Sequence, residues 1–207
     1  MMGAVATASA SDPSTEVPEE EFFRAQLYSL LARLLAAPPD AELLAALQGL
    51  VGDGSELGEA FAELARAAAT TTAAGVAEEY QDLFIGLGRG ELLPYGSFYL
   101  TGFLQEKPLA ELRADLARLG IARVPEVKEP EDHIAALCEV MAGLIDGGFG
   151  ERQALAVQRG LFDKHVAPWA GRFFGDLETA GTADFYRRVG RVGALFMGIE
   201  TTAFAMI

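Results

Sequence analysis

Apolar residues recur at helical spacing along almost the whole chain, and this regularity limits the possible folds more than any other feature. In EEEFFRAQLYSLLARLLAAPPD, spacings of three and four residues place Phe23, Leu27, Leu31 and Leu34 on one face of a helix. Similar segments follow, and glycines or prolines separate many of them. No window alternates apolar and polar residues long enough to indicate a half-buried strand. We therefore predict an all-α fold, a single bundle-like domain of about nine or ten helices.

The two ends of the chain favour a cytoplasmic protein without an integral membrane segment. The first residues, MMGAVATASASDPSTEVPEE, lack the basic region and the long apolar run of a secretory signal. The apolar C-terminal stretch GALFMGIETTAFAMI is too short to span a bilayer and contains Glu200. We therefore expect a flexible tail over residues 1–18 and one helical domain over residues 19–207.

Charge and cysteine content restrict the partners and the compartment. The 207 residues include 30 acidic and 16 basic ones, and the net charge of -14 argues against binding to nucleic acid or anionic membranes. Such a chain should attract basic partners instead. Cys138 has no second cysteine to pair with, which suits a reducing compartment. Its apolar position indicates an unreactive core thiol.

Residues that commonly carry catalysis or hold metals are too few here for either role. The glycines of GLGRG, residues 86–90, lack the preceding strand and the Gly-Lys-Ser/Thr ending of a phosphate loop, so we interpret them as a helix connector. His133 and His165 do not belong to a Glu-x-x-His pattern, and one cysteine is too few for structural zinc. Ser97 follows Pro-Tyr-Gly rather than a nucleophile elbow, and we expect it to cap a helix. The sequence therefore predicts no metal, no cofactor and no catalytic residue.

The stretch EPEDH, residues 129–133, places three acids beside one of the two histidines. Pro130 suits the first position of a helix, so Glu131 and Asp132 would face the positive end of the helix dipole. One acid is enough for that role, and the excess of charge favours docking of a basic partner. In LFDKHVAPWAGRFF the spacing predicts a core face, and we expect His165 to donate a hydrogen bond to a backbone carbonyl.

Three motifs occur in an order that resembles the TorD/DmsD family of redox-enzyme maturation chaperones. EYQDLFIGLGRGELLPYGSFYL resembles the family's Tyr-x-x-Leu-Phe-x-Gly segment and the Pro-aromatic-x-Ser-x-Tyr element that follows it. EPEDH matches the Glu-Pro-x-Asp-His signature, and HVAPW matches the late His-hydrophobic-x-Pro-Trp element. The resemblance covers the chain from about Glu20 to its C-terminus.

This resemblance implies an all-helical cytoplasmic chaperone without catalytic turnover. Long connectors in a helical fold permit domain swapping, so a monomer and a domain-swapped dimer both stay open. Its partners would be the twin-arginine leader peptide and the apo-form of a molybdenum-cofactor oxidoreductase of the DMSO reductase family, which it would hold back from export until the cofactor is inserted. The peptide-binding positions that carry over are Leu83, Phe84, Pro94, Tyr95, Glu129, Pro130, Asp132 and His133. Several relatives have Trp at the position of Tyr95, so the depth of the pocket and the choice of client stay open.

The side-chain chemistry is compatible with such a ligand. Arginine forks pair well with carboxylates, and an apolar stretch needs an aromatic-lined groove. We expect Asp132 and His133 to meet the arginines, and Leu83, Phe84 and Tyr95 to receive the apolar part. The sequence does not decide whether these two patches adjoin. Two other functions stay open: a small all-helical enzyme or nucleotide-binding protein that uses Asp132 and His133 as an acid–base pair, and a structural subunit with a large exposed apolar patch.

Overall fold

Ten α-helices make up most of the computed structural model, which describes residues 18–124 and 126–207. They are α1 (Glu19–Ala36), α2 (Ala41–Leu47), α3 (Glu56–Thr70), α4 (Ala73–Tyr80), α5 (Gly96–Thr101), α6 (Lys107–Arg118), α7 (Ile134–Asp146), α8 (Leu155–Leu161), α9 (Ala170–Thr179) and α10 (Phe185–Ala205). Two π-helical turns, η1 (Gln81–Ile85) and η2 (Phe162–Val166), continue α4 and α8. The described residues contain no β-strand, and the predicted all-α fold is confirmed. The tail expected over residues 1–18 lies, except for Pro18, outside the described residues.

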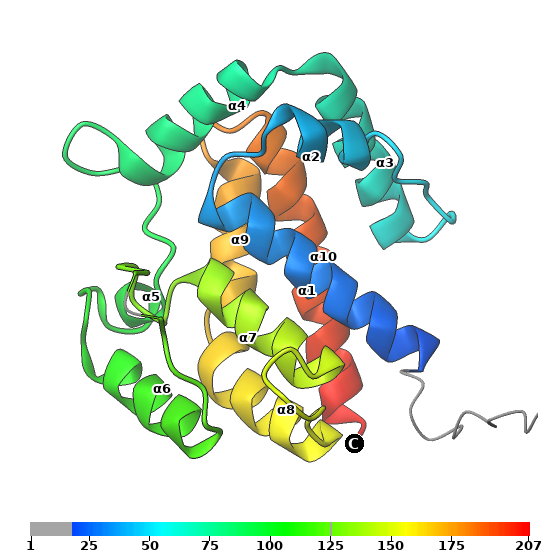
Figure 1. The fold of residues 1–207 in the computed structure, drawn as a ribbon. Helices are drawn as coiled ribbons and strands as arrows, with labels where there is room; N and C mark the ends of the chain where they lie inside the picture. The colour runs from blue at the N-terminus through cyan, green and yellow to red at the C-terminus, as the bar shows by residue number, and fades with distance from the viewer. Residues whose placement is uncertain (1–17, 125) are drawn as a thin grey trace, which may run out of the picture.

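Helices from opposite ends of the chain cross the middle of the molecule (Figure 1). α1 packs along α7, whereas α10 packs along α9 and α3. The sequence of α7, IAALCEVMAGLID, is apolar on almost every side, and a helix of that kind is stable only in an interior. Cys138 lies on α7 and is 1% exposed, as predicted. Burial raises the pKa of its thiol to about 12, so the thiol stays protonated.

A buried ion pair connects the first helix to the last. Arg24 Nε lies 2.7 Å from Glu200 Oε1, and the Tyr28 hydroxyl donates to the same carboxylate at 3.0 Å. Arg24 also donates to Gln158 of α8 at 3.2 Å. Burial lowers the pKa of Arg24, but the hydrogen bond and the charge of Glu200 outweigh burial and raise it. Three helices therefore depend on one network of polar groups.

The N-terminus of α10 is capped by a side chain from another helix. Thr182 lies just before this helix but does not cap it, because its hydroxyl donates to Glu91. Glu79, near the end of α4, accepts from the backbone N–H groups of residues 184–186 at 2.7, 3.0 and 2.7 Å. One carboxylate therefore satisfies three donors that an isolated helix would leave to water.

The turn η2 and the start of α9 form a face of the core. The predicted core residues of this segment are all buried: Phe162, Val166, Trp169 and Phe173. His165 Nε2 lies 2.6 Å from Asp115 Oδ2 of α6, so the hydrogen bond predicted from His165 to a backbone carbonyl is wrong. The carbonyl of His165 instead accepts from the Trp169 indole at 2.8 Å. His165 thus fixes α6 to the bundle.

Candidate functional site

Two of the sequence motifs meet through a short antiparallel bridge between Tyr95 and His133. Ile134 N donates to Pro94 O at 2.9 Å, and Gly96 N donates to Asp132 O at 2.9 Å. Tyr95 and His133 therefore form the non-hydrogen-bonded pair of the bridge, in which the two side chains lie on the same side and close together. Their rings meet edge to face with centroids 5.1 Å apart. The bridge thus explains why these two motifs share one site.

Asp132 is an interior residue, only 3% exposed. Its Oδ2 accepts from Ser97 N at 2.7 Å, at the start of α5, and its Oδ1 has no partner among the described groups. α7 begins at Ile134, not at Pro130, because residues 130–133 form a turn and His133 is the N-cap. The positions predicted for the acids at the start of this helix are therefore wrong. The predicted cap role of Ser97 is also wrong, since Ser97 lies within α5 and its hydroxyl accepts from Gln105 N.

The other two acids of EPEDH have partners of their own. Glu131 contacts Arg113 at 2.8 Å and Arg123 at 3.4 Å. Burial raises the pKa of Glu131, but the hydrogen bond from Arg113 outweighs burial and lowers it. Glu129 accepts from the Tyr95 hydroxyl at 2.5 Å. The pKa of Tyr95 is raised by burial first and by Glu129 second, so the hydroxyl keeps its proton as a donor.

An apolar pocket of about 680 Å³ lies beside the bridge. α1 and the two residues after it contribute one wall, mostly through small residues between Ser29 and Pro38, and α7 contributes Ala135 and Ala136. The aromatic residues of the pocket are Tyr80, Phe84 and Tyr95, and its charged residues are Arg33, Glu129 and Glu139. The rings of Tyr80 and Phe84 lie 4.9 Å apart. A long apolar side chain or a short peptide segment fits such a pocket better than a polar metabolite does.

The pocket brings together most of the residues predicted to bind a peptide. Five of them line it: Phe84, Pro94, Tyr95, Glu129 and His133. Leu83 and Asp132 lie beneath the surface, at 0% and 3% exposure, and Pro130 is outside the lining. The acidic motif and the aromatic motif therefore adjoin, which the sequence left open.

Three further lining residues, Arg33, Tyr80 and Glu139, are not among the positions predicted from the sequence. Glu139 interrupts the apolar run of α7, and Arg33 interrupts that of α1. A charge in an otherwise apolar helix was the available signal for both residues. That they face one pocket depends on the packing of α1 against α7, which no local pattern predicts.

His133 is held in one protonation state by its surroundings. It is 7% exposed, and its Nδ1 accepts from Ala135 N at 3.1 Å. Burial lowers the pKa of His133 to about 4, although Glu129 and Asp132 act in the opposite direction. The imidazole is therefore neutral near pH 7. Asp132 makes no hydrogen bond to His133, so the two residues do not form the acid–base pair that an enzyme would need.

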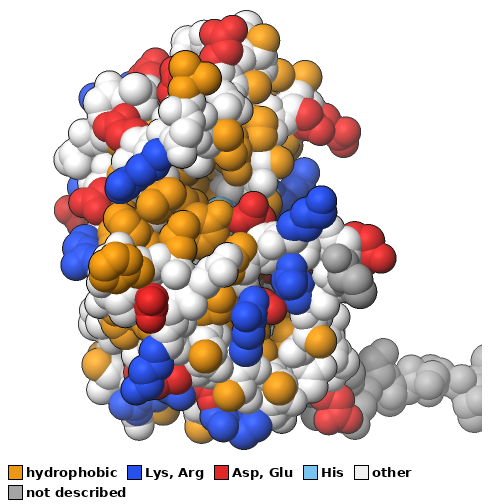
Figure 2. Space-filling model, turned by 90° about the vertical axis from the view of Figure 1, so that its left-hand side faces the viewer, with side chains coloured by type: hydrophobic (Ala, Val, Ile, Leu, Met, Phe, Trp, Pro, Cys, Tyr) orange, Lys and Arg blue, Asp and Glu red, His pale blue; other side chains and the backbone are white. Residues whose placement is uncertain are grey.

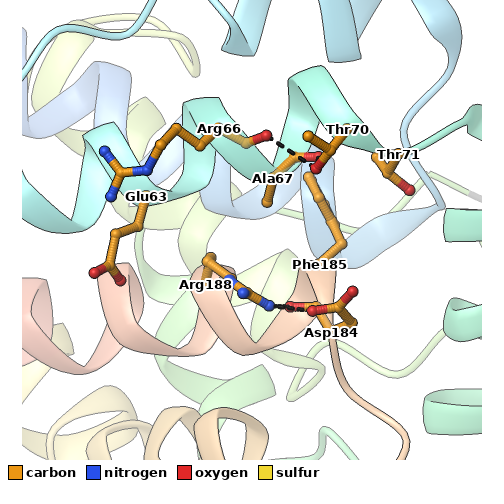
Figure 3. Close-up of a pocket in the computed structure, with 8 residues that line it drawn as sticks. All are labelled: Glu63, Arg66, Ala67, Thr70, Thr71, Asp184, Phe185 and Arg188. Carbon is orange, nitrogen blue, oxygen red and sulfur yellow. Dashed lines mark hydrogen bonds and ion pairs between the residues drawn. The ribbon is translucent and has the colours of Figure 1, made fainter.

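A second hollow, of about 370 Å³, lies between α3 and the start of α10 (Figure 3). Its lining carries charges of both signs, from Glu63, Arg66, Asp184 and Arg188. Arg188 pairs with Asp184 one turn away on the chain. None of the predicted binding residues lies in this hollow, so the motifs point only to the apolar pocket.

Exposed hydrophobic residues gather outside the pocket as well. Figure 2 shows hydrophobic side chains gathered on the side of the molecule where α5 and α6 lie in Figure 1. Leu100 of α5 and the residues Phe103 and Leu104 that follow this helix are at least 43% exposed. Within residues 18–124 and 126–207, no helix has the length and apolarity to cross a bilayer, and no group of three His, Cys, Asp or Glu side chains is placed to hold a metal.

Comparison with known proteins identifies the family. The family model of the nitrate reductase delta subunit matches residues 52–175, more than half of the chain. The chain belongs to this family, which includes the TorD chaperones. The family predicted from the three motifs is thereby confirmed.

Curated relatives of this chain include TorD chaperones of Vibrio and Aliivibrio species. The chaperone protein TorD of Vibrio atlanticus is 27% identical over 135 residues, which cover 61% of this chain and 63% of that protein. The TorD of Vibrio cholerae is 30% identical over 105 residues, or 47% of this chain and 48% of the relative. That of Aliivibrio fischeri is 38% identical over 69 residues, 32% of each chain. The matched region is less than two thirds of each of these relatives.

A solved structure supports the fold independently. The crystal structure of a protein from Archaeoglobus fulgidus, assigned to redox enzyme maturation, superposes with a TM-score of 0.57. The match covers 91% of this chain and 99% of the other, at 20% sequence identity. At that identity the likeness concerns the helical architecture alone, and it agrees with the fold predicted for the TorD/DmsD family.

Proposed function

We propose that this chain is a cytoplasmic chaperone that binds the twin-arginine leader of a molybdenum-cofactor oxidoreductase of the DMSO reductase family. It would hold the apo-form of that client back from export until the cofactor is inserted. One observation carries the proposal. Two family motifs, centred on Tyr95 and His133, meet at one apolar pocket with carboxylates at its edge.

The apolar part of a leader fits the wall of Tyr80, Phe84 and Ile85. Burial of apolar surface contributes roughly 25 cal/mol per Å², so a few buried side chains supply several kcal/mol of binding free energy. Ile85 is 52% exposed, although it lines the pocket. A bound apolar side chain would remove this exposed surface from water, and that burial favours binding.

The cationic part of a leader fits the carboxylates of Glu129 and Glu139. Arginine donates two parallel hydrogen bonds to a carboxylate, and lysine cannot reproduce that geometry. We assign this role to Glu129 rather than to Asp132, because Asp132 is buried and already accepts from Ser97. An arginine at Glu129 would compete with the Tyr95 hydroxyl for the carboxylate.

The experiment is a calorimetric titration of a twin-arginine leader peptide, and of its twin-lysine version, into the wild type and Glu129→Gln. We expect Glu129→Gln to weaken binding of the arginine peptide about tenfold, the scale of one charge-assisted hydrogen bond. The lysine peptide should lose less. Glu63→Gln, which neutralises a carboxylate of the other hollow, is the matched control and should bind like the wild type.

Two failures have separate meanings. Equal affinity of the arginine peptide for the wild type and Glu129→Gln would reject the assignment of Glu129. If none of the leaders of twin-arginine molybdoenzymes bound the wild type, the chaperone function itself would be rejected.

A further inference from the structure

His133 carries a hydrogen-bond donor that the protein itself does not use. Its Nδ1 accepts a hydrogen bond from Ala135 N, which requires a lone pair there. A neutral imidazole has one proton, so the proton is on Nε2. Among the described residues, none accepts a hydrogen bond from this Nε2, and the His133 side chain lines the apolar pocket. The free donor is thus the ring atom available to a ligand.

The ring cannot turn away from this position without cost. The hydrogen bond at Nδ1 caps the first turn of α7, where His133 is the N-cap. The edge of one ring packs against the face of the other in the pair with Tyr95. The residue as a whole is only 7% exposed. A donor held in this way is preorganised, so a ligand that places its acceptor at this point loses little free energy in ordering the ring.

The charges around the pocket decide which acceptor suits this donor. Glu129 and Glu139 in the lining are acidic and Arg33 is basic, and Asp132, next to His133 in the chain, is buried. Two carboxylates at the pocket disfavour a carboxylate ligand. Because burial lowers the pKa of His133 to about 4, the ring offers a neutral donor rather than a cation. A neutral carbonyl oxygen is therefore the acceptor that fits.

We infer that His133 Nε2–H donates a hydrogen bond to a main-chain carbonyl oxygen of the bound leader peptide and so sets the register of that peptide in the pocket. This inference rests on the proposed function, since it names how the same site recognises its ligand. It gives His133 a part separate from that of Glu129: the carboxylate selects the arginine side chain, and the imidazole selects the position of the backbone.

Two substitutions of His133 distinguish the roles of the two ring nitrogen atoms. The short amide of His133→Asn can still accept from Ala135 N, and Asn is a favourable N-cap, but this variant has no donor at the position of Nε2. The longer amide of His133→Gln can place a donor near the position of Nε2, but it does not supply the N-cap. His133→Asn therefore removes the contact to the ligand and keeps the helix cap, whereas His133→Gln keeps the contact and removes the cap.

The measurement is calorimetric titration of the leader, with urea unfolding of each variant as the stability readout. We expect His133→Asn to bind about tenfold more weakly and to unfold at nearly the urea concentration of the wild type. His133→Gln should keep most of the affinity and unfold at lower urea concentration. A purely structural role for His133 would produce the reverse order of affinities, and that result would overturn the inference.

The protonation state supplies an independent readout. In wild-type protein labelled with ¹⁵N at histidine, we expect the His133 ring, identified by its loss in His133→Asn, to stay neutral with the proton on Nε2 between pH 8 and pH 5. Leader affinity should change less than about twofold between pH 8 and pH 5.5. Titration near pH 6.5, accompanied by tighter binding at lower pH, would indicate a cationic donor and contradict the inference.

The outcomes for the inference and for the proposed function are distinguishable. If the leader binds the wild type and His133→Asn equally, the carbonyl contact is rejected while the chaperone function stands. If no leader binds the wild type, the proposed function is rejected, and the contact is rejected with it.

Discussion

Each acidic side chain of EPEDH has its own partner, although the three residues lie within four positions of one another. Glu129 accepts from Tyr95, Glu131 pairs with Arg113, and Asp132 accepts from Ser97. These partners lie 34, 18 and 35 positions away along the chain. The sequence shows the charges but not these long-range partners. From the sequence alone, the excess of charge predicts that this acidic cluster docks a basic partner. In the structure, Glu129 is the one acid of the three that lines the pocket.

Asp132→Asn is expected to destabilise the protein rather than to act mainly on binding. The Asn side chain would place an NH₂ group, which only donates, at the buried position where Asp132 Oδ1 has no partner. A neutral amide oxygen would also accept more weakly from Ser97 N than the carboxylate does. An unsatisfied buried group costs about 1–3 kcal/mol of unfolding free energy. Urea unfolding measures this loss, with Asp82→Asn as a matched control on an exposed site. Unchanged stability would mean that Asp132 is not the buried acceptor described above.

Helix boundaries show how much of an element local sequence can predict. The periodic segments indicate the helices, because the buried stripe is a property of each helix alone. The start of α10 is different, since its cap is Glu79 of α4, 105 to 107 positions away. The start of α7 is also not predicted by the local rules, because the bridge to Tyr95 holds its N-cap, His133, in extended backbone.

Glu79→Gln is expected to lower the free energy of unfolding by about 2 kcal/mol, because hydrogen bonds to a charged acceptor contribute about 1.5–3 kcal/mol. The carboxylate accepts three backbone N–H groups at the positive end of a 21-residue helix, and the neutral amide loses the charge and one acceptor. Thermal or urea unfolding measures the change. Glu78→Gln, exposed on the same helix, is the control and should have little effect. A loss of similar size in both variants would argue against this cap.

At the scale of the whole molecule, the pocket is a consequence of packing between distant helices. The three motifs predicted the family, and two of them supply five of the lining residues, because each motif is a local pattern that can be recognised in the sequence. Arg33 and Glu139 come from α1 and α7, and only the contact between these helices brings them to one cavity. The all-α class and the helices could therefore be predicted from the sequence. Of the pocket, only the residues that lie within the motifs could be predicted.

The ion pair between Arg24 and Glu200 is expected to stabilise this packing of distant helices. Glu200→Ala would remove the carboxylate that accepts from the Tyr28 hydroxyl and neutralises Arg24 in the interior, where only Gln158 would still accept from Arg24. Removing one partner of such a pair costs about 3 kcal/mol or more. The double variant with Arg24→Met removes both charges and should lose less than the single variant does. Urea unfolding of the four proteins measures the coupling, and strictly additive losses would contradict it.

The central claim is that the apolar pocket is where a leader binds. The most direct measurement is nuclear magnetic resonance of ¹⁵N-labelled protein during titration with a twin-arginine leader. We expect the largest changes in backbone amide shifts at Arg33, Ile85, Glu129 and Ala136, which come from separate elements and meet only at this pocket. Changes confined to the hollow between α3 and α10, or no changes with any leader, would contradict the claim.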